Sequence, residues 1–239
     1  MIPLRDNVPT RSFPIVTVSL IAVNVLVYVW EVSGKGLNNH VLRWGYYPCA
    51  IEGPCTNFYA AHHHELVATV FSSMFMHGGL IHIGGNMLFL WIFGNNVEDA
   101  LGRVRFLLWY LLAGFAATAA QTFVTLEFGT ARDASIPNVG ASGAIAGVLG
   151  AYFLLLPRAS VLTAIFLGFI FFFREIPAIL FLGIWIALQG LDGTLSLTTP
   201  QAGGGVAFFA HIGGFAFGIL TVKLVMKRAP LQPVSRYHW

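Results

Sequence analysis

Long apolar runs separated by short polar segments dominate the sequence from residue 14 onward. A helix needs about 20 mostly apolar residues to cross a lipid bilayer. The pattern therefore predicts an all-α, polytopic membrane protein with six transmembrane helices. The six stretches that come close to this length and carry almost no charge are 14–32, 78–97, 106–126, 138–157, 176–192 and 205–223.

A seventh apolar run covers residues 159–173, between Arg158 and Arg174, and is rich in phenylalanine. It is short for a spanning helix, so we interpret it as an interfacial or re-entrant piece, with a seventh span as the less favoured alternative.

Composition supports a membrane protein and changes little else. Mean hydropathy is +0.74 and charged residues make up 10% of the chain, against about 25% in soluble proteins. A chain of 239 residues fits one domain, or at most two small ones, and a net charge of +3 calls for no nucleic-acid partner. Residues 1–13 are polar and no cleavage site follows them, so we interpret the first apolar run as a span and not as a signal peptide.

Lysine and arginine predict the orientation. With six spans, ten of the thirteen basic residues fall on the side of the N-terminus. We therefore expect an integral, multi-pass protein of the cytoplasmic (inner) membrane with both termini cytoplasmic. Its predicted parts are a cytoplasmic segment 1–13, a transmembrane domain 14–228 with a long outer loop 33–76, and a cytoplasmic tail 229–239.

The outer loop carries the two cysteines and a histidine run. Cys49 and Cys55 have five residues between them. They would form a disulfide on an oxidising face or stay as two free thiols, and the sequence favours neither. His62, His63 and His64 have only Glu65 beside them, so we expect a solvated polar patch and no metal site.

Two polar residues interrupt otherwise uncharged spans. Ser142 lies in the Gly-Ala-Ser-Gly-Ala sequence at 140–144, and His211 lies in Ala-His-Ile-Gly-Gly at 210–214. An ionisable side chain at membrane depth is costly and marks a functional site by default. A serine and a histidine in separate spans suggest a nucleophile and its base.

These polar residues are predicted to converge at one depth, because spans two, four and six run in the same direction. Ser142 lies near the start of span four, and His211 lies about six residues into span six, roughly 9 Å along a helix. His82 and Asn86 lie near the start of span two and share a helix face. All four side chains therefore belong to the outer part of the bilayer.

Glycine spacing offers a way for spans four and six to touch. Small residues at three- and four-residue intervals let helix backbones approach closely in lipid. Such packing would bring Ser142 within reach of His211. The glycines concerned are Gly140, Gly143, Gly147 and Gly150 in span four, and Gly214 and Gly218 in span six.

Each residue has a simpler explanation when taken alone. Ser142 would be a packing residue, His82 and Asn86 interhelical hydrogen-bond partners, and His211 part of a proton path. Their shared depth favours chemistry. Spans four and six contain no carboxylate, so a Ser-His dyad without metal or cofactor is the simpler hydrolase. The side chains of His82 and Asn86 and the backbone N–H of Ser142 are candidate oxyanion donors.

These motifs resemble those of the rhomboid family of intramembrane serine proteases. The resemblance rests on the sequence from Gly140 to Gly143, on His211 with Gly214 and Gly218, and on His77, His82 and Asn86, and it covers about residues 15–223.

The resemblance implies a six-helix bundle with a water-filled cavity that hydrolyses peptide bonds in or near transmembrane segments of membrane-protein substrates. Ser142 would be the nucleophile, His211 the base, and His82 and Asn86 oxyanion donors.

The resemblance also implies roles for residues away from the reacting groups. His77 would tie the first outer loop to span two, and Glu98 would pack or pair locally, with Arg103 or Arg105 as its candidate partner. The partners that the resemblance implies for the whole protein are transmembrane substrates and the bilayer. Because an intact helix shields its peptide carbonyls, we expect substrates with Gly, Ala or Pro near the outer end of their span.

Two positions depart from the family pattern. Ala68 and Thr69 stand where many relatives have a Trp-Arg pair, and Ala146 replaces an aromatic residue that in some relatives stacks on the catalytic histidine. His211 must then be held by other groups, for which we expect neighbouring Phe or glycine-lined packing.

Two other functions remain open. One is a catalytically inactive rhomboid-like binder of transmembrane clients, and the other is a small transporter or proton-coupled channel that uses His211. The absence of an internal repeat disfavours the transporter.

Overall fold

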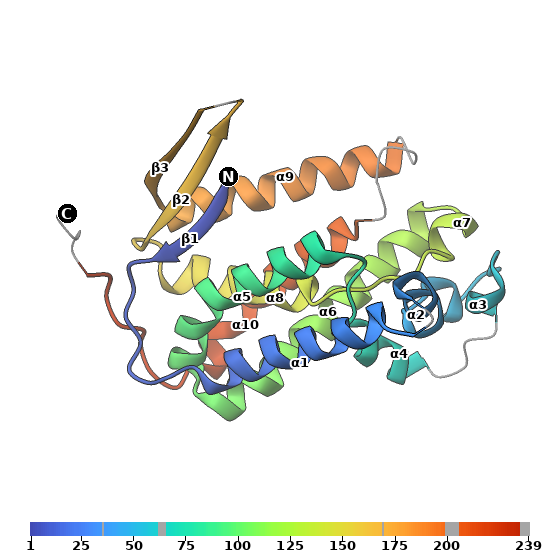
Figure 1. Ribbon diagram of the computed structural model, residues 1–239, viewed down its shortest axis with the longest axis horizontal. Helices are drawn as coiled ribbons and strands as arrows, with labels where there is room; N and C mark the ends of the chain where they lie inside the picture. Colours follow the sequence, from blue (N-terminus) through green and yellow to red (C-terminus); the bar gives the residue numbers. More distant parts are fainter. Residues whose placement is uncertain (35, 62–65, 169, 199–205, 235–239) are drawn as a thin grey trace.

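The computed structural model describes residues 1–34, 36–61, 66–168, 170–198 and 206–234. Helices occupy all six predicted positions: α1 (Ile15–Val32), α5 (Leu80–Leu101), α6 (Arg103–Phe128), α8 (Ser142–Leu155), α9 (Ala178–Thr198) and α10 (Phe208–Val225) (Figure 1). In the described part of the chain, α1, α6, α9 and α10 are long and apolar enough to cross a membrane. The chain is therefore a mostly helical, multi-pass membrane protein, and four of the six predicted spans meet this criterion.

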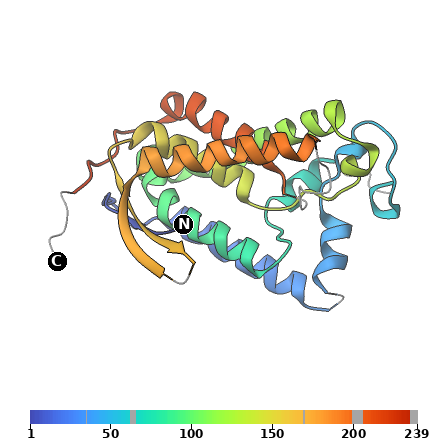
Figure 2. The same cartoon turned by 90° about the horizontal axis from the view of Figure 1, so that it is seen from above.

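Helix α8 is the centre of the bundle. It packs against α5, α6 and α10 (Figures 1 and 2), and residues 143–152 are all buried. Its 14 residues cover about 21 Å at 1.5 Å per residue. The bilayer core is about 30 Å thick, so α8 does not reach both faces and its ends lie within the thickness of the bundle.

Helices α8 and α10 touch backbone to backbone, as the glycine spacing predicts. A Cβ added to Gly214 would collide with the carbonyl oxygen of Gly143, and one added to Gly218 with that of Gly147. A Cβ on Gly150 would collide with the carbonyl of Phe215. Only residues without a side chain permit this approach, so glycines on both helices are required for the pair to form.

The predicted outer loop folds into short helices at one end of the bundle, here called the loop end (Figure 1). Of the two states left open for Cys49 and Cys55, the structure has the disulfide, with an S–S distance of 2.05 Å. The Tyr46 hydroxyl lies 2.9 Å from the Thr122 hydroxyl and holds the loop on α6.

The histidine run at 62–64 lies outside the described residues. The elements here are α2 (Leu37–Trp44), η1 (Pro48–Ala50), α3 (Phe58–Ala61), α4 (Leu66–Ser73) and α7 (Ala131–Ala134).

The apolar run at 159–173 forms strands. Strands β2 (Ser160–Leu167) and β3 (Ile170–Pro177) make an antiparallel hairpin, and β1 (Ile2–Asp6) pairs with the other edge of β2. Two arms of eight residues, rich in aromatic and β-branched side chains, suit strands, and Gly168 takes a φ of +60° at the turn. A seventh span is therefore wrong, and the polar N-terminal segment supplies the third strand.

The segments around Asn7 and Val234 meet at the opposite end of the bundle, here called the termini end. The Asn7 amide donates to the Val234 carbonyl at 3.1 Å. Asp6 accepts hydrogen bonds from the hydroxyl of Tyr152 in α8 at 2.6 Å and the amide of Asn96 in α5 at 2.7 Å. Burial raises the pKa of Asp6 to about 6. The N-terminal strand is thus tied to the central helix.

The glycine contact can be tested with two alanine substitutions. Gly214→Ala should lower the melting temperature in detergent, because its Cβ meets the backbone of α8; overpacking of this kind costs about 2 kcal/mol. Gly190→Ala in α9 is the control, since a Cβ there meets nothing within 4 Å, and alanine favours the helix. Equal melting temperatures for the two variants would contradict the close contact.

Candidate active site

Ser142 is the first residue of α8, and its position depends on Gly140 just before it. Gly140 has a φ of +131°, which disfavours other residues, and its N–H donates to the Ser73 carbonyl at 2.9 Å. A Cβ on Gly140 would lie 2.8 Å from Nε2 of His82 and 3.4 Å from Oγ of Ser142. The missing side chain therefore lets the His82 imidazole and the Ser142 hydroxyl share one space.

The start of α8 also favours negative charge near Ser142. The first four N–H groups of a helix have no partner within it, and the aligned peptide dipoles make this end positive. The residue before α8, Ala141, offers no side-chain cap. These N–H groups are therefore available to an oxyanion that develops beside Ser142.

His82 and Asn86 lie one turn apart on α5. The N–H of Gly78 donates to Nδ1 of His82 at 3.4 Å, so Nε2, the nitrogen nearer Gly140, carries the hydrogen. Asn86 is 8% exposed, and its amide nitrogen has no hydrogen-bond partner among the described residues. Both side chains can thus donate a hydrogen bond to a bound group.

His77 is buried between α1 and His82. Its backbone N–H lies 3.2 Å from each carboxylate oxygen of Glu31, the penultimate residue of α1. Its ring stands edge-on to that of His82, with centroids 5.1 Å apart. His77 was expected to tie the outer loop to span two; the contacts described for it join the start of α5 to the end of α1.

His211 is held by α9. Its Nδ1 lies 2.6 Å from Oε1 of Gln189, and its ring lies 5.7 Å from that of Trp185 at a tilt of 36°. The sequence led us to expect Phe or glycine-lined packing around this histidine, and the contacts found are with Gln189 and Trp185. Ala146, which stands at the position of the family's aromatic residue, instead lies against Gly214.

The glycine contact brings Ser142 and His211 to the same level of the bundle. Gly143, next to Ser142, packs its carbonyl against Gly214 and lies beside Ala210, the neighbour of His211. Within the described residues, the His211 side chain hydrogen-bonds Gln189 and not Ser142. Its Nε2 is thus free of a hydrogen bond to the described residues.

A small cavity opens beside Ser142. Its volume is about 30 Å³, enough for a water molecule or a small side chain, and Ala210 and Gln121 contribute to its wall. Gln121 accepts the N–H groups of Phe209 and Ala210 at 3.1 and 3.2 Å, which fixes the first turn of α10. A second cavity of about 140 Å³ shares Gln121 and reaches the loop end near Phe128.

Four residues around this site were missed by the sequence analysis, although three of them carry the signal that identified Ser142. Glu31, Gln121 and Gln189 are polar side chains inside predicted apolar spans. Trp185 carries no such signal, because a tryptophan among Ile and Leu is ordinary in a transmembrane helix. Its proximity to His211 depends on how α9 packs.

Glu98 was expected to pair with Arg103 or Arg105, and the structure corrects this. Its carboxylate accepts the Thr17 N–H at 2.7 Å, the Thr17 hydroxyl at 2.8 Å and the Val16 N–H at 3.1 Å. Helix α1 has no cap from its own preceding residue, and Glu98 supplies one from α5. A carboxylate at a helix N-terminus is favourable.

The fold defines a multi-pass helical membrane protein, in which Ser142 at the start of the central helix lies with His82 around Gly140. The family model described as "Rhomboid domain" matches residues 64–228. This chain belongs to the rhomboid family.

Curated relatives agree with this assignment. Rhomboid protein 1, mitochondrial, of Saccharomyces cerevisiae is 31% identical over 70% of this chain and 44% of its own length. Presenilin-associated rhomboid-like protein, mitochondrial, of Homo sapiens is 29% identical over 90% of this chain and 51% of its own length. A third, Presenilin-associated rhomboid-like protein A, mitochondrial, of Danio rerio, is 35% identical over 62% of this chain and 34% of its own length. The chain thus spans about half the length of these relatives, or less.

Gly140 gives a direct test of the site geometry. Gly140→Ala should lower the melting temperature by several degrees, because it combines an unfavourable φ with a collision against His82. Gly85→Ala, on the turn of α5 after His82, is the matched control, because a Cβ there meets nothing within 4 Å. A Gly140→Ala protein as stable as Gly85→Ala would show that His82 is not packed against Gly140.

Proposed function

We propose that this protein is an intramembrane serine endopeptidase that hydrolyses peptide bonds in or near transmembrane segments of membrane-protein substrates. One observation carries the proposal: His82 and Ser142 share the space left by Gly140 at the start of a buried helix. The glycine contact of α8 with α10 supports His211 as the base, since it holds the two helices together at that level. Membership of the rhomboid family supports the same reaction class.

The chemistry follows from the groups present. Nε2 of His211 takes the proton of the Ser142 hydroxyl while Oγ bonds to the substrate carbonyl carbon. The resulting oxyanion accepts hydrogen bonds from the Ser142 N–H, from Nε2–H of His82 and from the Asn86 amide. His211 then passes its proton to the leaving amine as the C–N bond breaks. Water attacks the acyl-enzyme by the same route and frees Ser142.

The membrane setting constrains the substrate. Peptide carbonyls in an intact transmembrane helix are hydrogen-bonded to their own helix, so attack needs local unwinding. The cavity beside Ser142 is small. Both points favour cleavage near glycine, alanine or another small residue at the weak end of a substrate helix.

We also propose that the termini end faces the cytoplasm and the loop end the opposite side. The lysine and arginine count supports this orientation, and so does the disulfide between Cys49 and Cys55, which favours an oxidising compartment. Residues 1–13, 14–228 and 229–239 are then a cytoplasmic segment, a transmembrane domain and a cytoplasmic tail. No metal or cofactor enters the proposed reaction.

The second candidate function is that of a catalytically inactive rhomboid-like protein that binds transmembrane clients. It is favoured by one observation, that His211 hydrogen-bonds Gln189 and not Ser142 in the described structure. The two functions differ in whether Ser142 is nucleophilic.

A fluorophosphonate probe, which labels activated serines, separates the two functions. The wild-type protein in membranes should be labelled, and Ser142→Ala and His211→Ala should not be. Asn86→Ala should slow labelling by up to roughly 10²-fold if Asn86 donates to the oxyanion.

The control is Ser19→Ala, which removes an exposed hydroxyl bonded to its own helix and should leave labelling unchanged. Absence of label on the wild-type protein, or equal label on Ser142→Ala, would favour the inactive binder.

A further inference from the structure

Gln189 occupies a position that the proposed reaction does not yet explain. It lies four residues after Trp185 on α9, so both side chains share the helix face that meets His211. Among the described residues, Gln189 is the hydrogen-bond partner of the His211 ring. The orientation of the imidazole therefore depends on a helix that carries neither Ser142 nor the oxyanion donors.

The contact selects one tautomer of His211. The Gln189 atom at 2.6 Å from Nδ1 is the amide oxygen, which carries no hydrogen and can only accept. Nδ1 must therefore be protonated, and a neutral ring then has its lone pair on Nε2. That is the form of histidine able to take a proton from a serine hydroxyl.

We propose that Gln189 is a positioning residue that fixes the tautomer and the ring orientation of His211. The inference rests on the proposed function and adds a third member to the Ser142–His211 pair. In serine hydrolase triads a buried carboxylate does this work. An amide supplies the same acceptor without a buried charge, which would be costly at membrane depth unless paired.

Two substitutions at position 189 separate positioning from packing. Gln189→Leu keeps the side-chain volume and removes the acceptor. It should lower the rate of fluorophosphonate labelling roughly tenfold, the factor that corresponds to about 1.4 kcal/mol.

Gln189→Glu restores the acceptor and adds a charge that favours protonated His211. It should therefore restore labelling at high pH and move the acidic limb of the pH–rate profile to higher pH. Leu188→Ala, an exposed neighbour on α9, should behave as wild type.

Nitrogen-15 chemical shifts of labelled histidine give a second readout that does not need activity. His211 should carry its proton on Nδ1 in the wild-type protein, and the Leu variant should shift the population toward Nε2–H. Unchanged labelling and an unchanged tautomer in Gln189→Leu would overturn the proposal. If the wild-type protein is not labelled at all, the protease function fails, and the tautomer shift alone still decides whether Gln189 positions His211.

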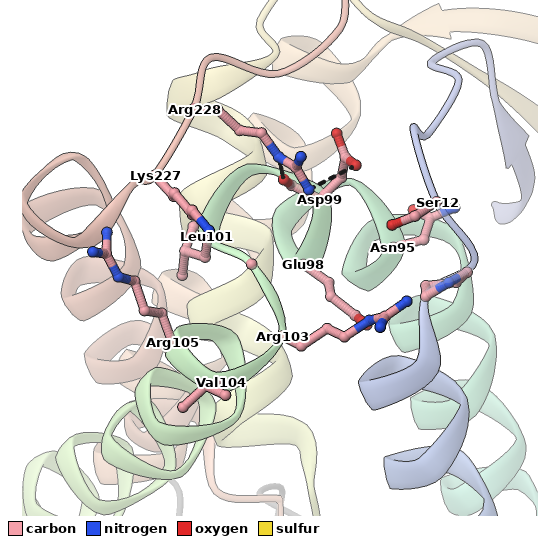
Figure 3. A pocket seen from close by; sticks show the side chains of 12 residues that line it. Ser12, Asn95, Glu98, Asp99, Leu101, Arg103, Val104, Arg105, Lys227 and Arg228 are labelled. Atoms are coloured by element: carbon pink, nitrogen blue, oxygen red, sulfur yellow. Dashed lines mark hydrogen bonds and ion pairs between the residues drawn. The ribbon is translucent and has the colours of Figure 1, made fainter.

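A cavity at the termini end supports a second, independent inference. It has a volume of about 500 Å³ and lies between the segment before α1, the end of α5, the start of α6 and the residues after α10 (Figure 3). It is far larger than the cavity beside Ser142. Its charged lining residues are Glu98, Asp99, Arg103, Arg105, Lys227 and Arg228.

Both carboxylates of this cavity already have partners. Glu98 caps α1 through Thr17. Asp99 forms ion pairs with Arg11 at 2.5 Å and Arg228 at 3.6 Å. Arg103 and Lys227 line the same cavity (Figure 3) and form no ion pair with any described residue. The cavity therefore presents two cationic side chains whose charge is not neutralised within the described structure.

The structure assigns this cavity to an anionic phosphate group, held by Arg103 and Lys227. The guanidinium of Arg103 matches the paired oxygens of a phosphate, and the ammonium of Lys227 adds a point charge. The cavity lies where α5 ends and α6 begins, and clusters of Lys and Arg at the ends of membrane helices bind anionic headgroups. The phosphate group is either that of an anionic phospholipid or free inorganic phosphate.

Thermal unfolding in a neutral detergent distinguishes the sources. Phosphatidylglycerol, phosphatidylcholine and inorganic phosphate are each added to wild-type protein and to the Arg103→Gln/Lys227→Gln double variant. A ligand that binds only the folded state raises the melting temperature, here by roughly 5 °C. A rise with phosphatidylglycerol alone identifies an anionic lipid, and a rise with inorganic phosphate identifies the free ion.

The double variant should lose the rise. Arg43→Gln/Arg132→Gln, which removes the same charge at the loop end, should keep it. The inference is overturned if neither phosphatidylglycerol nor inorganic phosphate raises the melting temperature, or if the rise persists in the Arg103→Gln/Lys227→Gln protein.

Discussion

The backbone contact between α8 and α10 is the constraint on which the rest of the structure depends. Lipid gives no hydrophobic reason for two apolar helices to associate, so close packing must supply the attraction. Gly150, Gly214 and Gly218 leave room for carbonyl groups of the facing helix to lie where side chains would stand. The two helices that carry Ser142 and His211 are therefore held in one register, since a shift along either axis would bring larger residues into the contact.

The polar site follows from this contact and from the shortness of α8. A helix of 14 residues at the centre of the bundle ends within it, so its unpaired N–H groups meet protein side chains. Because Gly140 has no side chain, His82 can lie beside the start of α8, and Gln121 fixes the first turn of α10. Buried polar groups in such surroundings need partners. Glu31 accepts the His77 N–H, Gln189 pairs with His211, and the Asn86 amide keeps a free donor.

At the termini end, hydrogen bonds and ion pairs of charged residues join the segments that close the bundle. Glu98 caps α1, and Asp99 joins Arg11 to Arg228, so segments far apart in sequence are joined around the end of α5. Asp6 reaches α8 and α5 from the three-stranded sheet. These contacts use protein groups to satisfy helix ends, and they leave Arg103 and Lys227 without a carboxylate partner among the described residues.

The sequence by itself determined the class of protein, the positions of six helices and the glycine faces that pack, because apolar length and spacing are local properties. It also singled out Ser142, His211, His82 and Asn86, since polar residues in apolar spans are conspicuous. Tertiary structure alone decided that 159–173 pairs with residues 2–6, that Glu98 caps α1 and that Cys49 bonds Cys55. It also placed Gln189 against His211. Each of these is a choice of partner across many residues, and the helix packing that brings the partners together is not visible in local sequence.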